Sequence, residues 1–286
     1  PIFLQNLWEL GFGIRDKNSS GSSGPGWYYY PHEYIDLTRM PPGTALSPPG
    51  GGAAAGDWHP AVVKPAFENL VVRAVPPVEV LPDVAAAHVK QLAPGLIFFD
   101  MGREIQGGIK LTVRSSATKA LEVTVRFAEE LLRQYGSQQS DGPAPAGCPG
   151  PRGVNGCIHA CEVNDTAFVG RPCFNMRTGT RYEDKWKIPA GPGVRSVQNH
   201  EYLEGRYGEL VFNDTSVTVQ DIQVGAWVVR ARYGRAATMS SSSDPLNKVF
   251  ELCRYTSEAT SLDLYADSNA RQRSADCMAD DNTAMR

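Results

Sequence analysis

Short runs in which apolar residues alternate with polar ones dominate the middle of the chain. Their apolar positions are mostly β-branched or aromatic, and Gly or Pro bounds them. A period of two with these residue types is typical of half-buried β-strands. The runs lie at residues 70–75, 96–100, 109–113, 121–127, 184–188, 209–212, 217–219 and 224–229. Their regular spacing predicts a mainly β fold, an antiparallel β-sandwich of the jelly-roll kind.

The hydrophobic period changes near residue 243, where Ser243-Asp244-Pro245 supplies a helix cap with Pro at the first helical position. Apolar residues then recur with the i, i+3, i+4, i+7 spacing of an amphipathic helix, at Leu246, Val249, Phe250 and Cys253. This segment therefore predicts a helix that packs on the sandwich or against further helices. Gly107 and Gly108, between two of the β runs, predict a tight connection.

These patterns divide the chain into three parts. Residues 1–68 form a loop-rich N-terminal β segment, because aromatic residues alternate there with long Gly/Ser/Pro stretches. We expect a β-sandwich domain over 69–238, with a Cys-rich insert at about 141–180. Residues 239–286 are expected to begin a helical domain.

Composition and charge exclude several classes of partner. The chain has 286 residues, 42% of them hydrophobic, and a formal net charge of -3. Such a balance, without basic runs, argues against binding to nucleic acid or to an anionic membrane. No apolar run reaches the length of a membrane span. No pattern in the sequence implies a cofactor or an oligomeric state, and no metal site is expected.

Four cysteines, Cys148, Cys157, Cys161 and Cys173, fall in the Gly/Pro-rich insert. Two local disulfides are the favoured interpretation, and a zinc site that includes Cys157, Cys161 and His159 is the alternative. Sequons at three positions, Asn18, Asn164 and Asn213, agree with a secreted protein. We therefore expect an extracellular or secretory location. Both remaining cysteines, Cys253 and Cys277, are expected to be small buried hydrophobes.

A dense group of charges lies near the end of the sequence, in Asp267-Ser-Asn-Ala-Arg271-Gln272-Arg273 and the acidic residues that follow. The acidic residues are Asp276, Asp280 and Asp281. Carboxylates that lie close together repel one another unless a substrate, proton or cation offsets their charge. Capping and a surface salt bridge would explain the group equally well, so the residues alone leave both interpretations open.

Several blocks occur in an order that resembles the bacterial and fungal α-L-rhamnosidases of glycoside hydrolase family 78. The blocks are HEYIDLTR at 32–39, WHPA at 58–61, PPVEV at 76–80, FDMGREIQGG at 99–108, VRFAEEL at 125–131, YLEGRY at 202–207 and SDPLN at 243–247. The resemblance implies β-sandwich modules followed by an (α/α)6 barrel of the six-hairpin type. It also implies inverting hydrolysis of terminal α-L-rhamnosides, with a rhamnose-containing glycoside or polysaccharide as the partner.

The family resemblance assigns roles within the charged segment. Asp267 and Arg271 would bind the hydroxyl groups of rhamnose. Gln272 would stand where the family has the acidic residue that protonates the leaving oxygen, and an amide cannot supply that proton. Asp280, or Asp281 if one residue is inserted, would be the trailing carboxylate of the signature.

Inverting hydrolysis also needs a general base about 6.5–9.5 Å from the acid. We expect this base beyond Arg286, so the chain is interpreted as a fragment without rhamnosidase activity of its own. The alternative is a non-catalytic carbohydrate-binding or structural β-sandwich protein, which Gln272 and the Cys-rich insert would suit.

Overall fold

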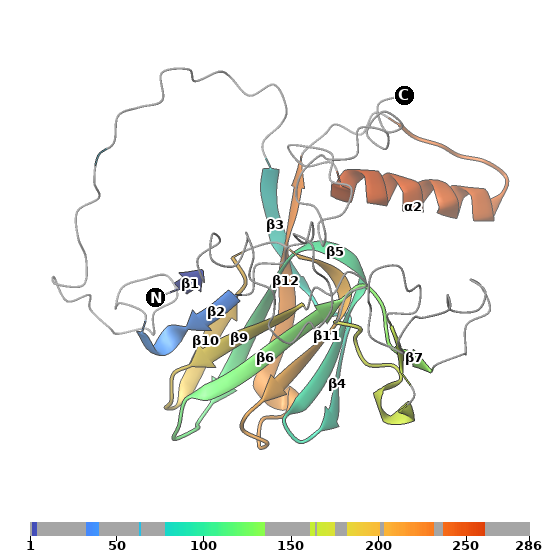
Figure 1. Cartoon of the computed structure of the whole chain (residues 1–286). Helices are drawn as coiled ribbons and strands as arrows, with labels where there is room; N and C mark the ends of the chain where they lie inside the picture. Colours follow the sequence, from blue (N-terminus) through green and yellow to red (C-terminus); the bar gives the residue numbers. More distant parts are fainter. Residues whose placement is uncertain are drawn as a thin grey trace, which may run out of the picture.

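The computed structural model describes residues 2–4, 33–39, 63, 78–134, 161–163, 165–174, 182–200, 203–231 and 237–260. Strands dominate this part of the chain, and a helix follows them (Figure 1). The strands are β1 (Ile2–Leu4), β2 (Glu33–Asp36), β3 (Val78–Ala85), β4 (His88–Ala93), β5 (Leu96–Ser115), β6 (Leu121–Ala128), β7 (Arg133–Gln134), β8 (Glu162–Val163), β9 (Glu183–Ile188), β10 (Gly193–Gln198), β11 (Leu203–Phe212) and β12 (Ile222–Ala231). The helices are η1 (Leu37–Arg39), η3 (Thr166–Phe168), η4 (Val219–Asp221) and α2 (Asp244–Thr260). The predicted mainly β fold is confirmed.

The main sheet is continuous and mixed. Its strand order is β1-β2-β9-β6-β11-β5-β12-β3, with β4 and β10 also paired to β5. The pairing of β2 with β9 is parallel, whereas the other pairings in this sheet are antiparallel. A small parallel pair, β7 and β8, lies apart from it.

Strand β5 joins the two halves of the sheet. Over its first half it pairs with β4 and β11, and over its second half with β10 and β12. Because twisted strands of this length bend, the sheet curls into a sandwich-like half-barrel around one core (Figure 1). The single long strand β5 thus belongs to both halves of the curled sheet.

Alternation along the strands builds the core. In β6 every second side chain is buried, and these residues are Leu121, Val123, Val125 and Phe127. β9 adds Trp186 and Ile188 from the neighbouring strand. Burial of a large apolar side chain of this kind stabilises a fold by about 1.5–3 kcal/mol. The hydrophobic pattern therefore fixed which face of each strand points inward.

Gly107 and Gly108 do not form the predicted turn, because both lie inside β5. A Cβ at Gly107 would stand 1.8 Å from the carbonyl oxygen of Trp227, and one at Gly108 would stand 2.4 Å from the indole of the same residue. The two glycines thus allow β12 to approach β5 closely, and the indole Nε1 of Trp227 donates to the carbonyl oxygen of Asn199 at 2.9 Å. Two consecutive glycines inside β5 therefore leave the space that the main chain and indole of Trp227 occupy.

Two other strand predictions have different outcomes. Residues 217–219 are not a strand, because Thr218 caps the short helix η4 and its side chain pairs with Asp221 in a capping box. The run at 70–75 lies outside the described residues. The runs assigned to β5, β6, β9, β11 and β12 are confirmed.

Helix α2 begins at Asp244, as the change of period predicted. The Asn247 side chain holds the preceding segment, because its Oδ1 accepts from the Ser241 amide at 2.9 Å and its Nδ2 donates to the Ser241 carbonyl at 3.0 Å. The prediction that Cys253 is buried is wrong: the thiol is free and exposed. The helix contacts the sheet through Tyr255, and Cys253 lies two residues away, on the opposite side of the helix.

Candidate functional site

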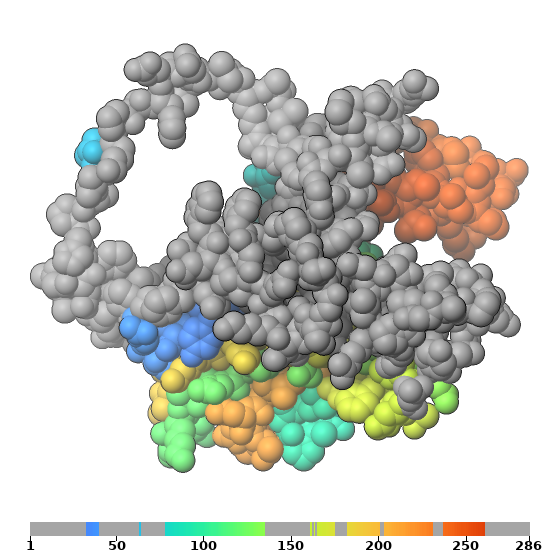
Figure 2. Space-filling model, in the orientation of Figure 1, coloured from blue at the N-terminus to red at the C-terminus, as the bar shows by residue number. Residues whose placement is uncertain are grey.

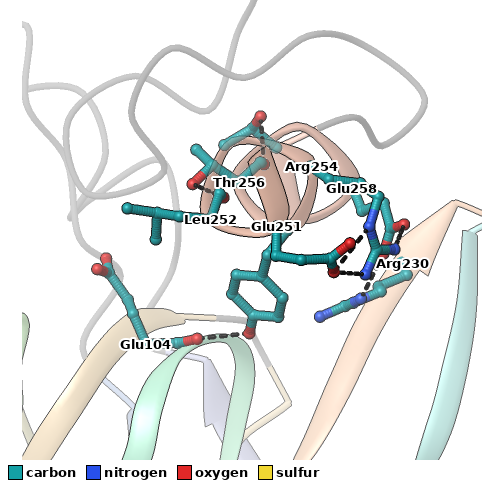
Figure 3. A network of polar contacts seen from close by, with 9 residues as sticks. Glu104, Arg230, Glu251, Leu252, Arg254, Thr256 and Glu258 are labelled. Carbon is teal, nitrogen blue, oxygen red and sulfur yellow. Dashed lines mark hydrogen bonds and ion pairs between the residues drawn. The ribbon is translucent and has the colours of Figure 1, made fainter. Parts of the chain in front are cut away.

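Tyr255 attaches α2 to the sheet. Its hydroxyl donates a hydrogen bond of 2.6 Å to the main-chain oxygen of Glu104 in β5 (Figure 3). The guanidinium groups of Arg103 and Arg230 each lie 4.7 Å from the centre of its ring. Arg230 also pairs with Glu258 of the helix at 3.1 Å. A cation over an aromatic face contributes about 0.5–1 kcal/mol at a partly exposed site, so the attachment is polar and cation–π in character.

The apolar positions of α2 do not share in this contact. Leu246, Val249 and Leu252 are 49%, 55% and 65% exposed. Figure 2 shows the surface of α2, in orange, open over much of its length. Within the described part of the chain, no helix is long and apolar enough to cross a membrane.

Three carboxyl groups gather where β5, β6 and β11 approach one another: Glu104, Glu129 and Glu204. Burial, together with the charges of Glu204 and Glu104 and a hydrogen bond to Glu204, raises the pKa of Glu129 to about 8. Burial and the charge of Glu204 also raise the pKa of Glu104. A carboxyl group that keeps its proton near neutral pH can donate a hydrogen bond or a proton.

Gln106 stands beside this carboxyl cluster, directly across the ladder from Glu204. Its side chain is buried, and its Oε1 atom accepts no hydrogen bond from the residues that the structure describes. Among the residues that the structure describes, no group of three or more His, Cys, Asp or Glu side chains is arranged to hold a metal ion.

Asp100 and Arg206 form a two-pronged ion pair between β5 and β11. The Nε and Nη2 atoms of Arg206 donate to the two carboxylate oxygens at 2.8 and 3.0 Å. The Gly102 amide donates to Asp100 as well, at 2.7 Å. These hydrogen bonds, led by that from Arg206, hold the pKa of Asp100 below its usual value. The pair joins two of the blocks on which the family resemblance rests.

A buried polar network crosses the sheet near β2. The Asn199 side chain accepts from the Ile109 amide at 3.1 Å and donates to Asp184 at 2.7 Å. Asp184 accepts from the Glu33 amide at 2.8 Å, and Glu33 accepts from the His200 amide at 2.8 Å. Buried polar groups are stable only when they are hydrogen-bonded, and this chain of contacts fixes the position of β2 on the sheet.

The Cys-rich insert contains a disulfide between Cys161 and Cys173. This finding confirms the favoured disulfide chemistry for that pair and excludes Cys161 as a zinc thiolate. Arg171, inside the closed loop, donates to both carboxylate oxygens of the buried Glu209 in β11, at 2.5 and 2.7 Å. Cys148, Cys157 and His159 lie outside the described residues.

All the catalytic and sugar-binding residues predicted from sequence also lie outside the described residues. They are Asp267, Arg271, Gln272, Asp280 and Asp281. Sequence reasoning did not single out the carboxyl cluster or the Asp100–Arg206 pair. Their members lie inside blocks used for the family resemblance, but only the pairing of distant strands brings them together.

The structure is similar to those of α-L-rhamnosidases. The enzyme of Streptomyces avermitilis, complexed with L-rhamnose, matches with a TM-score of 0.55 and 17% identity, over 87% of this chain and 20% of that chain. The enzyme of Aspergillus terreus gives a TM-score of 0.49 and 17% identity, over 87% of this chain and 24% of that chain. The enzyme of Dictyoglumus thermophilum gives a TM-score of 0.48 and 18% identity, over 68% of this chain and 18% of that chain.

At this identity the likeness shows a common fold. This chain spans about a fifth of the length of the Streptomyces enzyme. No protein-family model and no curated protein matches the sequence. The fold of the described residues therefore agrees with that of a part of a rhamnosidase.

Proposed function

We propose that this chain is the β module and first helical segment of a rhamnosidase-like glycoside hydrolase. The whole enzyme would hydrolyse terminal α-L-rhamnosides with inversion of the anomeric configuration. The observation that carries the proposal is the fold similarity to the Streptomyces enzyme over 87% of this chain. In this proposal the curled sheet is a platform, and α2 is the first helix of an (α/α)6 barrel. The exposed apolar residues of α2 support the proposal, because helices of such a barrel bury that kind of surface against one another.

The chemistry of the proposed enzyme belongs to the segment after α2. Asp267 and Arg271 hold the rhamnose hydroxyl groups, and Asp280 or Asp281 supplies the trailing carboxylate. Gln272 holds the place of the proton donor but has no proton of suitable acidity, so the leaving group departs slowly, as its anion. The base that activates water belongs to a part of the protein beyond Arg286. We also propose that the protein is secreted, and the Cys161–Cys173 disulfide supports an oxidising compartment.

The proposal is tested with a chromogenic α-L-rhamnoside. We expect no turnover by the chain of 286 residues and measurable turnover by the product of the whole reading frame. Asp267→Asn should abolish that turnover, whereas Gln272→Glu should raise it by restoring a proton donor. If the chain of 286 residues turns the substrate over, and Asp267→Asn abolishes that turnover, the predicted need for a distant base is wrong.

The second candidate is a non-catalytic protein that binds carbohydrate or has a structural role. Gln272 favours it, because loss of the acidic group removes general-acid catalysis while leaving Asp267 and Arg271 able to bind a sugar. Titration of the whole protein with L-rhamnose, followed by NMR, distinguishes the two. Binding without hydrolysis, retained in Gln272→Glu, identifies the binding protein.

A further inference from the structure

The sequon at Asn213 has a well-defined place in the fold. Asn213 directly follows β11, and both Asn213 and Thr215 are exposed. Between them, Asp214 turns the chain, because its carboxylate accepts from the amide and the hydroxyl of Ser216 at 2.9 and 2.7 Å. The acceptor and hydroxyl residues of the sequon are thus both presented to solvent on a polar turn.

The Asn213 side chain is held by its oxygen. The Glu122 amide donates to Oδ1 at 3.0 Å, and the Asn213 amide donates to the Glu122 carbonyl at 2.9 Å. The side-chain oxygen therefore replaces a main-chain carbonyl and prolongs the ladder between β6 and β11. Since Oδ1 faces β6, Nδ2 occupies the other corner of the amide, where no described residue bonds to it.

The turn also has room for a bulky group. It lies beyond the Phe212–Val123 pair, whereas α2 contacts β5 at Glu104. Glu104 lies next to the residue of β5 that pairs with Gly205, so about eight residues of β11 separate the turn from the level of α2, or roughly 25 Å at 3.3 Å per residue. The first sugar attached to Asn213 would therefore lie well away from α2 and the carboxyl cluster.

We propose that Asn213 is an acceptor for N-linked glycosylation. In this reaction Nδ2 forms a bond to C1 of the first sugar of a lipid diphosphate-linked oligosaccharide. The bond between C1 and the diphosphate breaks, the lipid diphosphate leaves with the electron pair, and the amide loses one proton. The Cys161–Cys173 disulfide is an independent sign that the chain meets the oxidising compartment where this transfer occurs.

The test is secretion of the chain from a eukaryotic cell, followed by enzymatic deglycosylation in heavy-oxygen water and peptide mass spectrometry. We expect residue 213 to carry the heavy-oxygen aspartate that deglycosylation leaves. Thr215→Ala should abolish the label, and Thr215→Ser, the matched control, should retain it. Asn213→Asp keeps an oxygen for the Glu122 amide and should lose only the glycan.

An unmodified residue 213 in the secreted wild-type chain would overturn the proposal. Modification at Asn18 or Asn164 in the same sample would show that the chain had met the transferase. The melting temperature of Asn213→Asp should equal that of the deglycosylated wild type, because both proteins carry aspartate at residue 213. Label that persists in Thr215→Ala would also contradict the proposal, because the sequon would then not direct the modification.

Discussion

Asp100 and Arg206 are 106 positions apart in the sequence, and their ion pair joins two of the blocks that resemble the rhamnosidase family. Two N–H groups of the guanidinium donate to the two oxygens of the carboxylate, and the Gly102 amide is a third donor. Charge-assisted pairs with this geometry are stronger than single hydrogen bonds. The pair fixes β11 against the first half of β5, where the sheet curls.

Arg206→Lys should lower the free energy of unfolding by about 1 kcal/mol, because lysine keeps the charge and loses the fork. Urea denaturation measures the change. Arg133→Lys is the control, since Arg133 forms an exposed pair with Glu130 and pairs of that kind contribute little. Equal effects of the two substitutions would show that the two-pronged contact is unimportant.

Glu129 makes the stability of the protein depend on pH. Its pKa is raised from 4.5 to about 8, so between these values the folded state holds a proton that the unfolded state has released. The free energy of unfolding should therefore fall as pH rises from about 4.5 to about 8, by at most about 1.4 kcal/mol per pH unit from this group. Glu129→Gln, which imitates the protonated form, should flatten the profile. Identical slopes in both proteins would contradict the shifted pKa.

At the scale of elements, Tyr255 attaches α2 to the sheet, together with the ion pair between Arg230 and Glu258. Tyr255→Ala removes the hydrogen bond to Glu104 and both cation–π contacts. Amide hydrogen exchange in α2 should then become at least several-fold faster, because about 1–3 kcal/mol of attachment is lost. Leu252→Ala, at an exposed position of the same helix, should leave the exchange nearly unchanged. Comparable acceleration by both variants would mean that Tyr255 does not hold the helix.

The Cys161–Cys173 loop should stabilise the sheet through Arg171. Removal of the disulfide by the double change Cys161→Ser and Cys173→Ser should lower the free energy of unfolding by about 2–4 kcal/mol. Part of this loss should be shared with Arg171→Ala, since both changes weaken the contact of Arg171 with the buried Glu209, which Arg126 also contacts at 3.5 Å. A double-mutant cycle measures the shared part. Strict additivity would show that the loop and the ion pair act independently.

Elements with a regular period were predictable from sequence, and elements that depend on a distant partner were not. β6 and α2 follow their hydrophobic patterns closely. Gly107 and Gly108 were misinterpreted as a turn, because only the approach of Trp227 explains them. Cys253 fits the helical stripe but is exposed, since the stripe predicts an apolar face and not what covers it. The carboxyl cluster likewise depends on strand register.

At the scale of the whole molecule, the described residues form a curled β sheet with a helix attached through polar contacts. The fold agrees with part of a rhamnosidase, and the chain spans 20% of the length of the Streptomyces enzyme. The proposed sugar-binding residues, Asp267 and Arg271, come seven and eleven residues after Thr260, the last residue of the helix that Tyr255 anchors. In this account the β module positions the start of the barrel, and the sugar is bound and hydrolysed beyond it.

The most direct test of this account is the proton NMR spectrum of an aryl α-L-rhamnoside during incubation with the product of the whole reading frame. We predict that β-L-rhamnose appears first and then mutarotates, because water attacks the face opposite the leaving group. The same sample with Asp267→Asn should leave the substrate intact. If the wild-type whole protein leaves the substrate intact, or releases the α anomer first, the proposal of an inverting rhamnosidase is wrong.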